Sequence, residues 1–450
     1  LIFQGAVEQR NFRGRGQTIG LNLAYSNYSK QVDLSFTEPY VFDKNVSLGV
    51  NVYRRDLNSF NYFNNDRNTI YQQATTGFQI RAGVPLSEYV SAIGSYTFNY
   101  DDISVDRSQY FSDRQNPPLL ECDPIQAGRY LCDALGKRTS SILGLTLVYD
   151  TLDNRYRPSR GRSFSVTTEF AGLGGSVKYV RFRGNAAQFF SLGKGFIFSL
   201  KAEGGAIAPW GGGTAAGTEA VRLTDRFYLG EPQLRGFDIR GIGPRMLRKP
   251  LIDIDPSTTV TTPGPDPDRT RWSDDALGGR YYYLGHAELE IPLGSGAREM
   301  GLRPSIFMDI GAVWGIKPPV EQVTPFPNGL FVATRDPTGA ALYQQINVAT
   351  LVGTVCTPGT AAGSVTTVTN SVNPTPPSCL ASANNIALGS YTGAFQEFFV
   401  GNSPKPRISI GIGVNWNSPF GPFRIDFAHA LTTVDGDDTK SFTFNVGTQF

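Results

Sequence analysis

Residues 17–27 read QTIGLNLAYSN, and apolar residues alternate there with small or polar ones throughout. Ile19, Leu21, Leu23 and Tyr25 fall on one side of an extended chain, and the residues between them fall on the other. A period of two residues is typical of a β-strand, whereas a helix repeats its faces every 3.6 residues. The stretch therefore predicts a strand with one apolar face and one polar face.

The same alternation recurs along the chain, for example in residues 45–53, 162–170 and 441–450. A soluble β-sandwich gives the same local pattern, but here the polar side is rich in Gly, Ser and Asn, as in a water-filled lumen. We predict an all-β chain with about fifteen strands. The predicted strands are residues 1–10, 17–27, 30–38, 45–56, 70–83, 89–102, 139–150, 161–173, 177–191, 196–207, 281–292, 303–314, 406–417, 421–431 and 440–450.

The connections between these strands tend to alternate between short turns and long loops. Transmembrane antiparallel β-barrels have short turns at the periplasmic end and long loops outside the cell. Residues 1–450 are therefore predicted to form one transmembrane β-barrel domain. Its long extracellular loops are predicted near 103–138, 208–280 and 315–405, with a shorter connection at 57–69.

The composition excludes several other classes of protein. Charged residues make up 18% of the 450 residues, below the roughly 25% of soluble domains, and aromatic residues make up 12%. No stretch approaches about 18 consecutive apolar residues, which excludes a transmembrane helix but not a barrel. The formal net charge is only +2 and no long run of Lys or Arg occurs, so we expect no nucleic-acid partner.

Catalytic and metal sites are also disfavoured. The chain has only two histidines, His286 and His429, and the alternation places the first toward the lumen and the second on the apolar side. A Ser-His-Asp site needs a histidine within hydrogen-bond distance of both partners. We therefore predict no catalytic residue, no metal and no cofactor.

The four cysteines fall in two local pairs, each within one turn-rich segment. Zinc sites use shorter cysteine spacings and often nearby histidines. Two disulfides in an oxidising compartment explain the spacing better. Because local pairing has the smallest loop-closure cost, we predict Cys122–Cys132 and Cys356–Cys379.

Residues 228–237 read YLGEPQLRGF, and their Arg-Gly-Phe core resembles the signature loop of the BamA-type outer-membrane protein assembly family. Further segments are similar to that family in the same order along the chain. They are QRNFRGRG at 9–16, FTEPY at 36–40, YDTLDN at 149–154 with Pro158 and Gly161, and WNSPFGP at 416–422 with the tail to Phe450. The resemblance extends over nearly the whole chain.

The resemblance implies an insertase barrel of about sixteen strands, in which residues 1–10 correspond to the second strand. The first strand and the periplasmic POTRA domains would then precede this chain. Barrel proteins would be folded and inserted at a weak seam between the first and last strands, without a cofactor. On the last strand the seam residues would be Phe442, Phe444, Gly447 and Phe450.

The resemblance also implies partners. They are unfolded outer-membrane β-barrel proteins as substrates, accessory periplasmic lipoproteins, the lipid bilayer and lipopolysaccharide. Two alternatives remain open. One is a relative with a narrower set of substrates (TamA-like) or a role in secretion, and the other is a passive porin.

The signature loop predicts a latch inside the lumen, formed by Leu234, Arg235, Gly236 and Phe237. Strand alternation turns Glu290 inward, and in the next strand it turns Asp309 inward. We predict that Arg235 pairs with Glu290, Asp309 or both, since these strands follow the loop directly. The simpler alternative is that Arg235 is solvated, as most loop arginines are.

Overall fold

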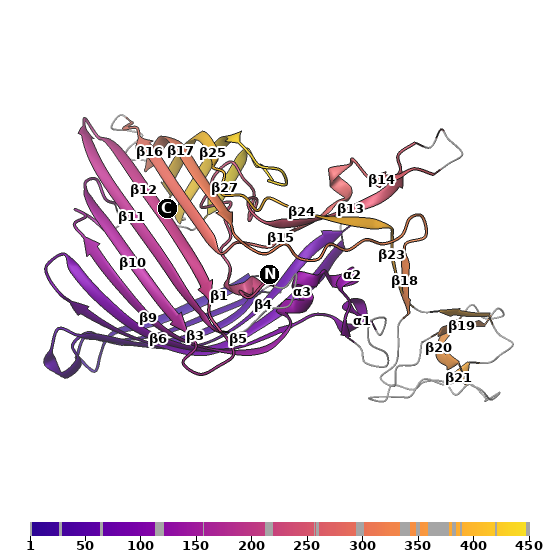
Figure 1. Ribbon diagram of the computed structural model, residues 1–450. Coiled ribbons are helices and arrows are strands. Elements are labelled where there is room, and N and C mark those ends of the chain that lie inside the picture. Colours follow the sequence, from indigo (N-terminus) through magenta and orange to yellow (C-terminus); the bar gives the residue numbers. More distant parts are fainter. Residues whose placement is uncertain are drawn as a thin grey trace.

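The computed structural model describes residues 2–26, 29–63, 66–112, 121–155, 157–211, 219–255, 257, 261–293, 301–333, 343–347, 352–358, 378–379, 384–387, 389–418 and 421–446. Its main feature is a 15-stranded antiparallel sheet whose strands follow one another in chain order. The strands lie side by side and curve around a common axis (Figure 1). The predicted all-β barrel with about fifteen strands is therefore confirmed.

The strands of the main sheet match most of the predicted ranges. They are β1 Ile2–Phe12, β2 Gln17–Ser26, β3 Ser29–Glu38, β4 Ser47–Phe63, β5 Asp66–Pro85, β6 Val90–Ser104, β9 Gly136–Asp150, β10 Gly161–Ala171, β11 Tyr179–Gly193, β12 Phe196–Pro209, β16 Tyr281–Glu290, β17 Leu302–Trp314, β25 Arg407–Ser418, β26 Gly421–Thr432 and β27 Phe442–Val446.

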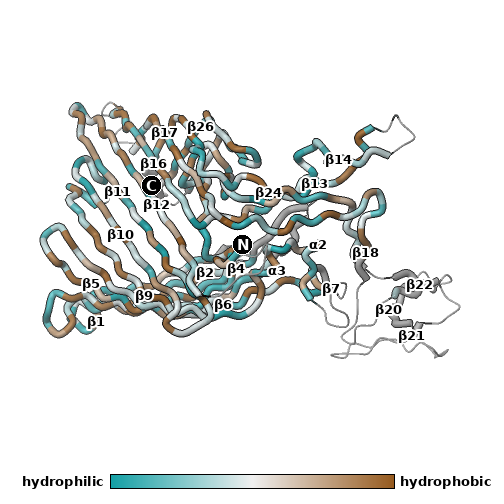
Figure 2. Tube along the Cα trace, viewed as in Figure 1, coloured by the Kyte–Doolittle hydropathy of each residue, from teal (hydrophilic) through white to brown (hydrophobic). Residues whose placement is uncertain are grey.

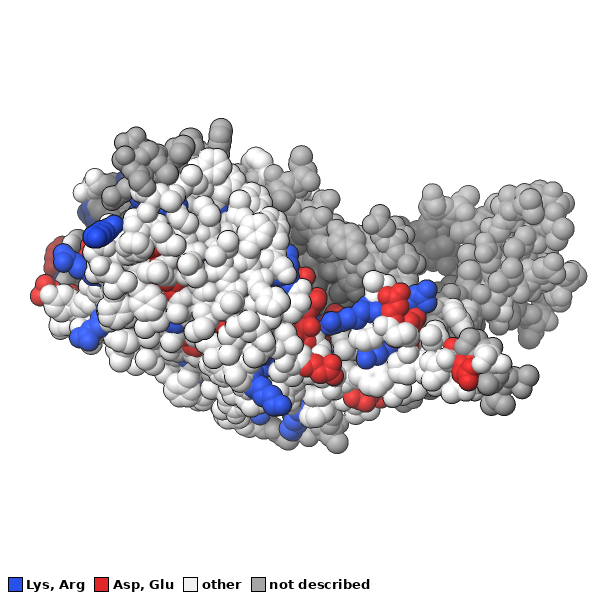
Figure 3. Space-filling model, turned by 90° about the horizontal axis from the view of Figure 1, so that it is seen from above, with Lys and Arg blue, Asp and Glu red and all other residues white. Residues whose placement is uncertain are grey.

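The outer wall of the sheet is apolar, as the alternation predicts. In β9 the side chains of Leu143, Leu145 and Leu147 are exposed on the outside, whereas Gly144 between them is buried and Thr146 is half-buried. Hydrophobic and hydrophilic residues alternate along the large strands (Figure 2). Seen from above, a broad uncharged wall lies between two charged ends (Figure 3). Such a band matches the hydrocarbon core of a bilayer.

The predicted connection at 57–69 is wrong, because β4 and β5 extend through most of it as one long hairpin. Their ladder continues to Phe63 opposite Asp66. The sequence there, LNSFNYFNNDRNT, mixes polar and aromatic residues on both sides of the strands, so neither side is consistently apolar. Beyond the lipid, backbone pairing can continue without an apolar face, so alternation no longer marks the strand.

The two longest connections contain strands of their own. β13 (Arg245–Asp253) pairs with β24 (Phe395–Val400) and with β15 (Ser273–Ala276), and this small sheet projects from one end of the barrel (Figure 1). The remaining short strands are β7 Phe111–Ser112, β8 Glu121–Cys122, β14 Pro263–Pro265, β18 Leu330–Ala333, β19 Tyr343–Asn347, β20 Val352–Pro358, β21 Ser378–Cys379, β22 Asn384–Ala387 and β23 Gly389–Thr392.

The helices are short. They are α1 Arg107–Tyr110, α2 Pro124–Ala127, α3 Arg129–Ala134 and the 3-10 turns η1 Val41–Asp43, η2 Leu223–Asp225 and η3 Arg269–Arg271. In the part of the chain that the structure describes, none is long and apolar enough to cross a membrane.

A disulfide joins Cys122 to Cys132, with the two Cα atoms 5.5 Å apart, and it ties α3 to the strand before α2. The predicted pairing of these two cysteines is confirmed. The side chains of Cys356 and Cys379 lie outside the described residues, so their pairing stays a prediction.

The main sheet ends at β1 on one side and at β27 on the other. Among the described residues no backbone ladder joins these two strands. Edge strands carry unpaired N–H and C=O groups that can pair with another strand. The two ends of the sheet are therefore the only edges of the main sheet within the described ranges.

Candidate functional site

The connection between β12 and β16 folds back into the barrel and fills part of its interior. Leu234 and Phe237 are both 0% exposed and pack with inward-facing residues of the wall, including Leu284 and Val313. The turn that carries them is closed by a hydrogen bond from the Leu234 N–H to the Gly230 carbonyl, 2.8 Å long. The loop is therefore held by apolar packing on both sides of Arg235.

Gly236 lets this loop approach the wall closely. Its φ is 88°, and a Cβ atom added there would lie 3.0 Å from the Ser409 Cβ and 3.4 Å from the Ala428 Cβ. A side chain at this position would both strain the backbone and press against β25 and β26. The Ser409 hydroxyl also donates a hydrogen bond to the Arg235 carbonyl, which fixes the loop backbone on the wall.

Arg235 binds Asp309 in a bidentate pair. Its Nε lies 2.7 Å from Oδ2 and its Nη2 lies 2.6 Å from Oδ1, while the Arg235 backbone N–H donates to Oδ2 at 3.2 Å. The Asp309 side chain is 0% exposed, and a hydrogen bond of 2.9 Å links it to His286 Nδ1. The guanidinium lies 3.4 Å from the centre of the Phe307 ring. This planar stacking and forked pairing are specific to arginine.

Glu288 is the second carboxylate at the guanidinium. Its Oε2 accepts from Arg235 Nη1 at 3.0 Å, and its Oε1 accepts from the Ser305 hydroxyl at 2.6 Å and from Arg424 Nη2 at 3.1 Å. Arg424 in turn pairs with Asp426 at 2.8 Å. The latch is therefore a buried network of two arginines and three carboxylates that joins β16, β17 and β26 to the loop.

Glu290, predicted as a partner of Arg235, is not one in the structure. It shares the inward face with Glu288 but lies two residues further along β16, opposite Ser305, and its nearest cation is Arg303 at 3.7 Å. Two residues of strand correspond to about 7 Å. Alternation identifies the face of a side chain but not how deep the loop reaches, which is why Glu288 takes the place predicted for Glu290.

Three further members of the network were missed from the sequence. Arg424 and Asp426 lie two residues apart on the polar face of β26, and His286 lies on that of β16. The available signal was a pair of opposite charges on the inward face of a strand, which is costly in a barrel wall unless the charges are partnered.

The seam residues of the last strand are partly described. The side chains of Phe442 and Phe444 face outward, 48% and 51% exposed, and their rings lie 5.1 Å from Phe427 and 6.0 Å from Phe423. Gly447 and Phe450 lie outside the described residues.

The latch borders a lumen cavity of about 630 Å³ that is lined by charged residues of both signs, including Lys201, Glu203 and Arg303. Among the described residues, no group of three or more His, Cys, Asp or Glu side chains is placed to hold a metal ion. The charged side chains of the lining support ion pairing and hydrogen bonding.

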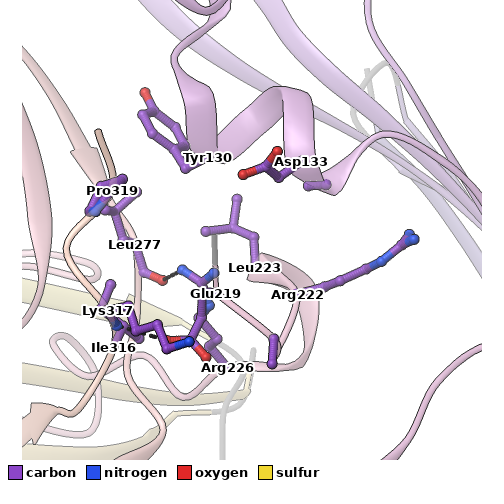
Figure 4. A pocket seen from close by; sticks show the side chains of 12 residues that line it. Tyr130, Asp133, Glu219, Arg222, Leu223, Arg226, Leu277, Ile316, Lys317 and Pro319 are labelled. Carbon is purple, nitrogen blue, oxygen red and sulfur yellow. Dashed lines mark hydrogen bonds between the residues drawn. The ribbon is translucent and has the colours of Figure 1, made fainter. Parts of the chain in front are cut away.

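A smaller cavity of about 140 Å³ lies between α3 and the connections that surround it (Figure 4). Its polar groups already hold these connections together: Arg226 Nη1 donates to the Leu277 carbonyl at 3.0 Å, and the Lys317 N–H donates to Glu219 at 2.7 Å. Burial raises the pKa of Asp133 at its edge. The cavity belongs to the packing of the loops, and we assign it no ligand.

The chain has known relatives along its length. It is 22% identical to the outer membrane protein assembly factor BamA of Neorickettsia risticii over 98% of this chain and 42% of that protein. It is also 22% identical to BamA of Neisseria meningitidis serogroup B over 100% of this chain and 45% of that protein. The chain thus spans less than half the length of these curated relatives.

A solved structure and a family model also match this chain. The crystal structure of BamA from Haemophilus ducreyi lacking POTRA domains 1–3 is similar with a TM-score of 0.61 and 20% identity, over 99% of this chain and 66% of that one. The fold is therefore that of the BamA barrel. The Omp85 superfamily domain matches residues 11–450. The resemblance inferred from the sequence is confirmed, and the chain belongs to the Omp85 superfamily.

Proposed function

We propose that this chain is the barrel of an outer-membrane protein insertase, which folds β-barrel proteins and inserts them into the bacterial outer membrane. The observation that carries the proposal is the buried Arg235 latch inside a sheet whose first and last strands are not paired with each other among the described residues. The relatives named as outer membrane protein assembly factors support it.

The mechanism uses the backbone of β27 (Phe442–Val446). Its outer edge offers N–H and C=O groups to an incoming strand, which pairs with it by β-augmentation. In lipid each unpaired backbone group costs several kcal/mol, so a strand that pairs before it meets the hydrocarbon avoids most of that cost. The step requires neither a nucleotide nor a cofactor, and no side chain is chemically changed.

The latch stabilises the strand next to this edge. β26, which pairs with β27, carries Arg424 and Asp426 of the latch network. The hydrogen bonds of the network therefore hold the strand that presents the free edge. Unfolded outer-membrane barrel proteins are the proposed substrates, and periplasmic accessory lipoproteins, lipid and lipopolysaccharide are the proposed partners.

A passive porin is a poorer fit to the lumen. A pore needs an open water-filled passage, whereas Leu234, Arg235 and Phe237 are buried inside this barrel. Single-channel recordings distinguish the two functions, since a porin conducts steadily and a plugged insertase conducts weakly and irregularly.

The direct test reconstitutes the full-length protein in liposomes and adds an unfolded outer-membrane barrel protein. We expect the substrate to become protease-resistant and heat-modifiable faster than with empty liposomes. Arg235→Ala should slow this, whereas Arg240→Ala, an exposed arginine of the same loop, should not. Equal folding rates with and without the wild-type protein would refute the proposed function.

A further inference from the structure

The lumen loop has a second attachment, to the turn that precedes the last strand. We call residues 433–441, between β26 and β27, the terminal turn. Its backbone pairs with the loop just beyond Arg235. The links are an isolated bridge between Phe237 and Thr439, and hydrogen bonds from Asp238 N to Asp438 O at 3.0 Å, from Asp438 N to Gly241 O at 2.7 Å and from Lys440 N to Gly236 O at 3.2 Å.

Side-chain charges reinforce this backbone pairing. Lys440 Nζ lies 2.7 Å from Glu231 Oε2 and 3.6 Å from Asp238 Oδ1. The Glu231 side chain is only 8% exposed, so its charge depends on this partner more than a surface carboxylate would. Lys440 thus binds one carboxylate before the Arg-Gly-Phe core, that of Glu231, and one after it, that of Asp238.

The other end of the terminal turn is fixed to the barrel wall instead. Arg407 at the start of β25 pairs with Asp437 through Nε at 3.0 Å and Nη2 at 3.2 Å, and both side chains are 0% exposed. The Val434 N–H also donates to Asp437 at 2.6 Å. The wall therefore holds the turn up to Asp437, and the lumen loop holds the residues that follow it.

Those following residues lead directly into the seam. Lys440 lies two residues before Phe442, where β27 begins, and β27 has a ladder on only one side among the described residues. An edge strand attached at one side shifts more easily than a central one. At this end its position depends on the hydrogen bond from the Ala428 N–H to the Ser441 carbonyl, 2.9 Å long, and on whatever holds Lys440.

We propose that Lys440 is a positioning residue: together with Glu231 and Asp238 it forms a clasp that couples the lumen loop to β27. When the clasp is closed, the loop holds the strand edge in register. When the clasp opens, β27 gains freedom to separate from its neighbour or to accept a new strand. The role of the clasp in insertion rests on the proposed function, but the coupling itself does not.

The test measures hydrogen–deuterium exchange of the full-length protein in lipid nanodiscs, without substrate. Lys440→Glu places a third carboxylate beside Glu231 and Asp238, so we expect exchange in both the lumen loop and residues 442–446 to rise about tenfold or more. Lys405→Glu is the matched control, because it makes the same charge change at an exposed lysine outside the clasp. It should leave both segments within about twofold of wild type.

A charge swap provides the second arm. Glu231→Lys combined with Lys440→Glu restores opposite charges and should return the exchange of residues 442–446 most of the way to wild type. Lys440→Gln, which removes the charge and keeps much of the stem, should give a smaller rise of about two- to fivefold. Heat-modifiable mobility shows that each variant retains its barrel.

The outcomes separate the two proposals. Equal exchange in Lys440→Glu and Lys405→Glu, or faster exchange in the loop with none in β27, would overturn the coupling. Coupled exchange in a protein that does not accelerate substrate folding would leave the clasp in place and refute the insertase function instead.

Discussion

Replacing Arg235 by Ala should loosen the lumen loop by a large and measurable amount. The substitution removes two charged hydrogen bonds to Asp309 and one to Glu288, together with the stacking on Phe307. Glu288 keeps Ser305 and Arg424 as donors, so the loss there is small. Asp309 is fully buried and, among the described residues, keeps His286 and the backbone N–H of residue 235 as hydrogen-bond partners.

The free-energy cost of Arg235→Ala comes mainly from the buried Asp309 carboxylate, which is left without its cation. Removing one member of a buried pair costs about 3–5 kcal/mol, because the other charge is left without its partner. The lumen cavity of about 630 Å³ is lined by Arg235, so truncating this side chain should open the site to water, which places the cost near the lower end. A local cost of about 3 kcal/mol is roughly a 100-fold change in the opening equilibrium of the loop.

Amide exchange in residues 229–242, measured in lipid nanodiscs, reports this equilibrium directly. We expect roughly a 100-fold increase for Arg235→Ala and a smaller one for Arg235→Lys, which keeps the charge but loses the forked geometry. The double variant with Asp309→Ala should cost less than the sum of the two single changes, since neither charge is then left alone. The reasoning is refuted if Arg235→Ala exchanges within threefold of wild type while the barrel remains folded.

Three other predictions follow from local geometry. Gly236→Ala should increase amide exchange of the same loop about tenfold, because φ is positive there and the added Cβ would lie 3.0 Å from the Ser409 Cβ. Gly14→Ala is the control: its φ is also positive but the space around it is open, so it should not affect that loop. Cys132→Ser should make residues 121–134 more sensitive to protease, at a local cost of about 2–3 kcal/mol, without changing the heat-modifiable mobility of the barrel. The amides of Ser159 and Arg160 both donate to Asp153, whose pKa is lowered to about 2, first by the hydrogen bond from the Ser159 hydroxyl. A lowered pKa means that the carboxylate supports the turn above its ordinary pKa and loses this effect only as pH falls toward 2. Protection of these two amides relative to Asp153→Ala should therefore persist at pH 3; its disappearance already at pH 4 would contradict the assignment.

The strands of the wall could be predicted because lipid and lumen impose opposite preferences on alternate residues. Where a strand no longer separates lipid from lumen, the alternation of apolar and polar residues is lost and the strand cannot be predicted. In the β4–β5 hairpin at 57–69, polar and aromatic residues are mixed on both faces, and only the backbone pairing reveals this part as strand. β13 and β24 pair across more than a hundred residues of sequence. Their pairing depends on how the two connections fold together, which neither segment shows alone.

For the candidate site, the sequence predicts which side chains face the lumen but not which of them contact Arg235. Alternation turns both Glu288 and Glu290 toward the lumen, and the depth of Arg235 decides between them. That depth is set by the packing of Leu234 and Phe237 and by the closeness that Gly236 permits. These are tertiary contacts, which no period in the sequence encodes. The Lys440 clasp was missed for a similar reason, since its partners belong to a loop some two hundred residues earlier.

The pairing of β13 with β24 has a consequence for how antibodies can recognise the projecting sheet. The projecting sheet draws adjacent strands from two separate connections, so a surface patch across it is discontinuous in the sequence. A synthetic peptide copied from either connection would lack the neighbouring strand and its shape. Antibodies raised against the folded protein would therefore bind epitopes that loop peptides do not reproduce, and an immunogen based on this barrel would have to present both connections together.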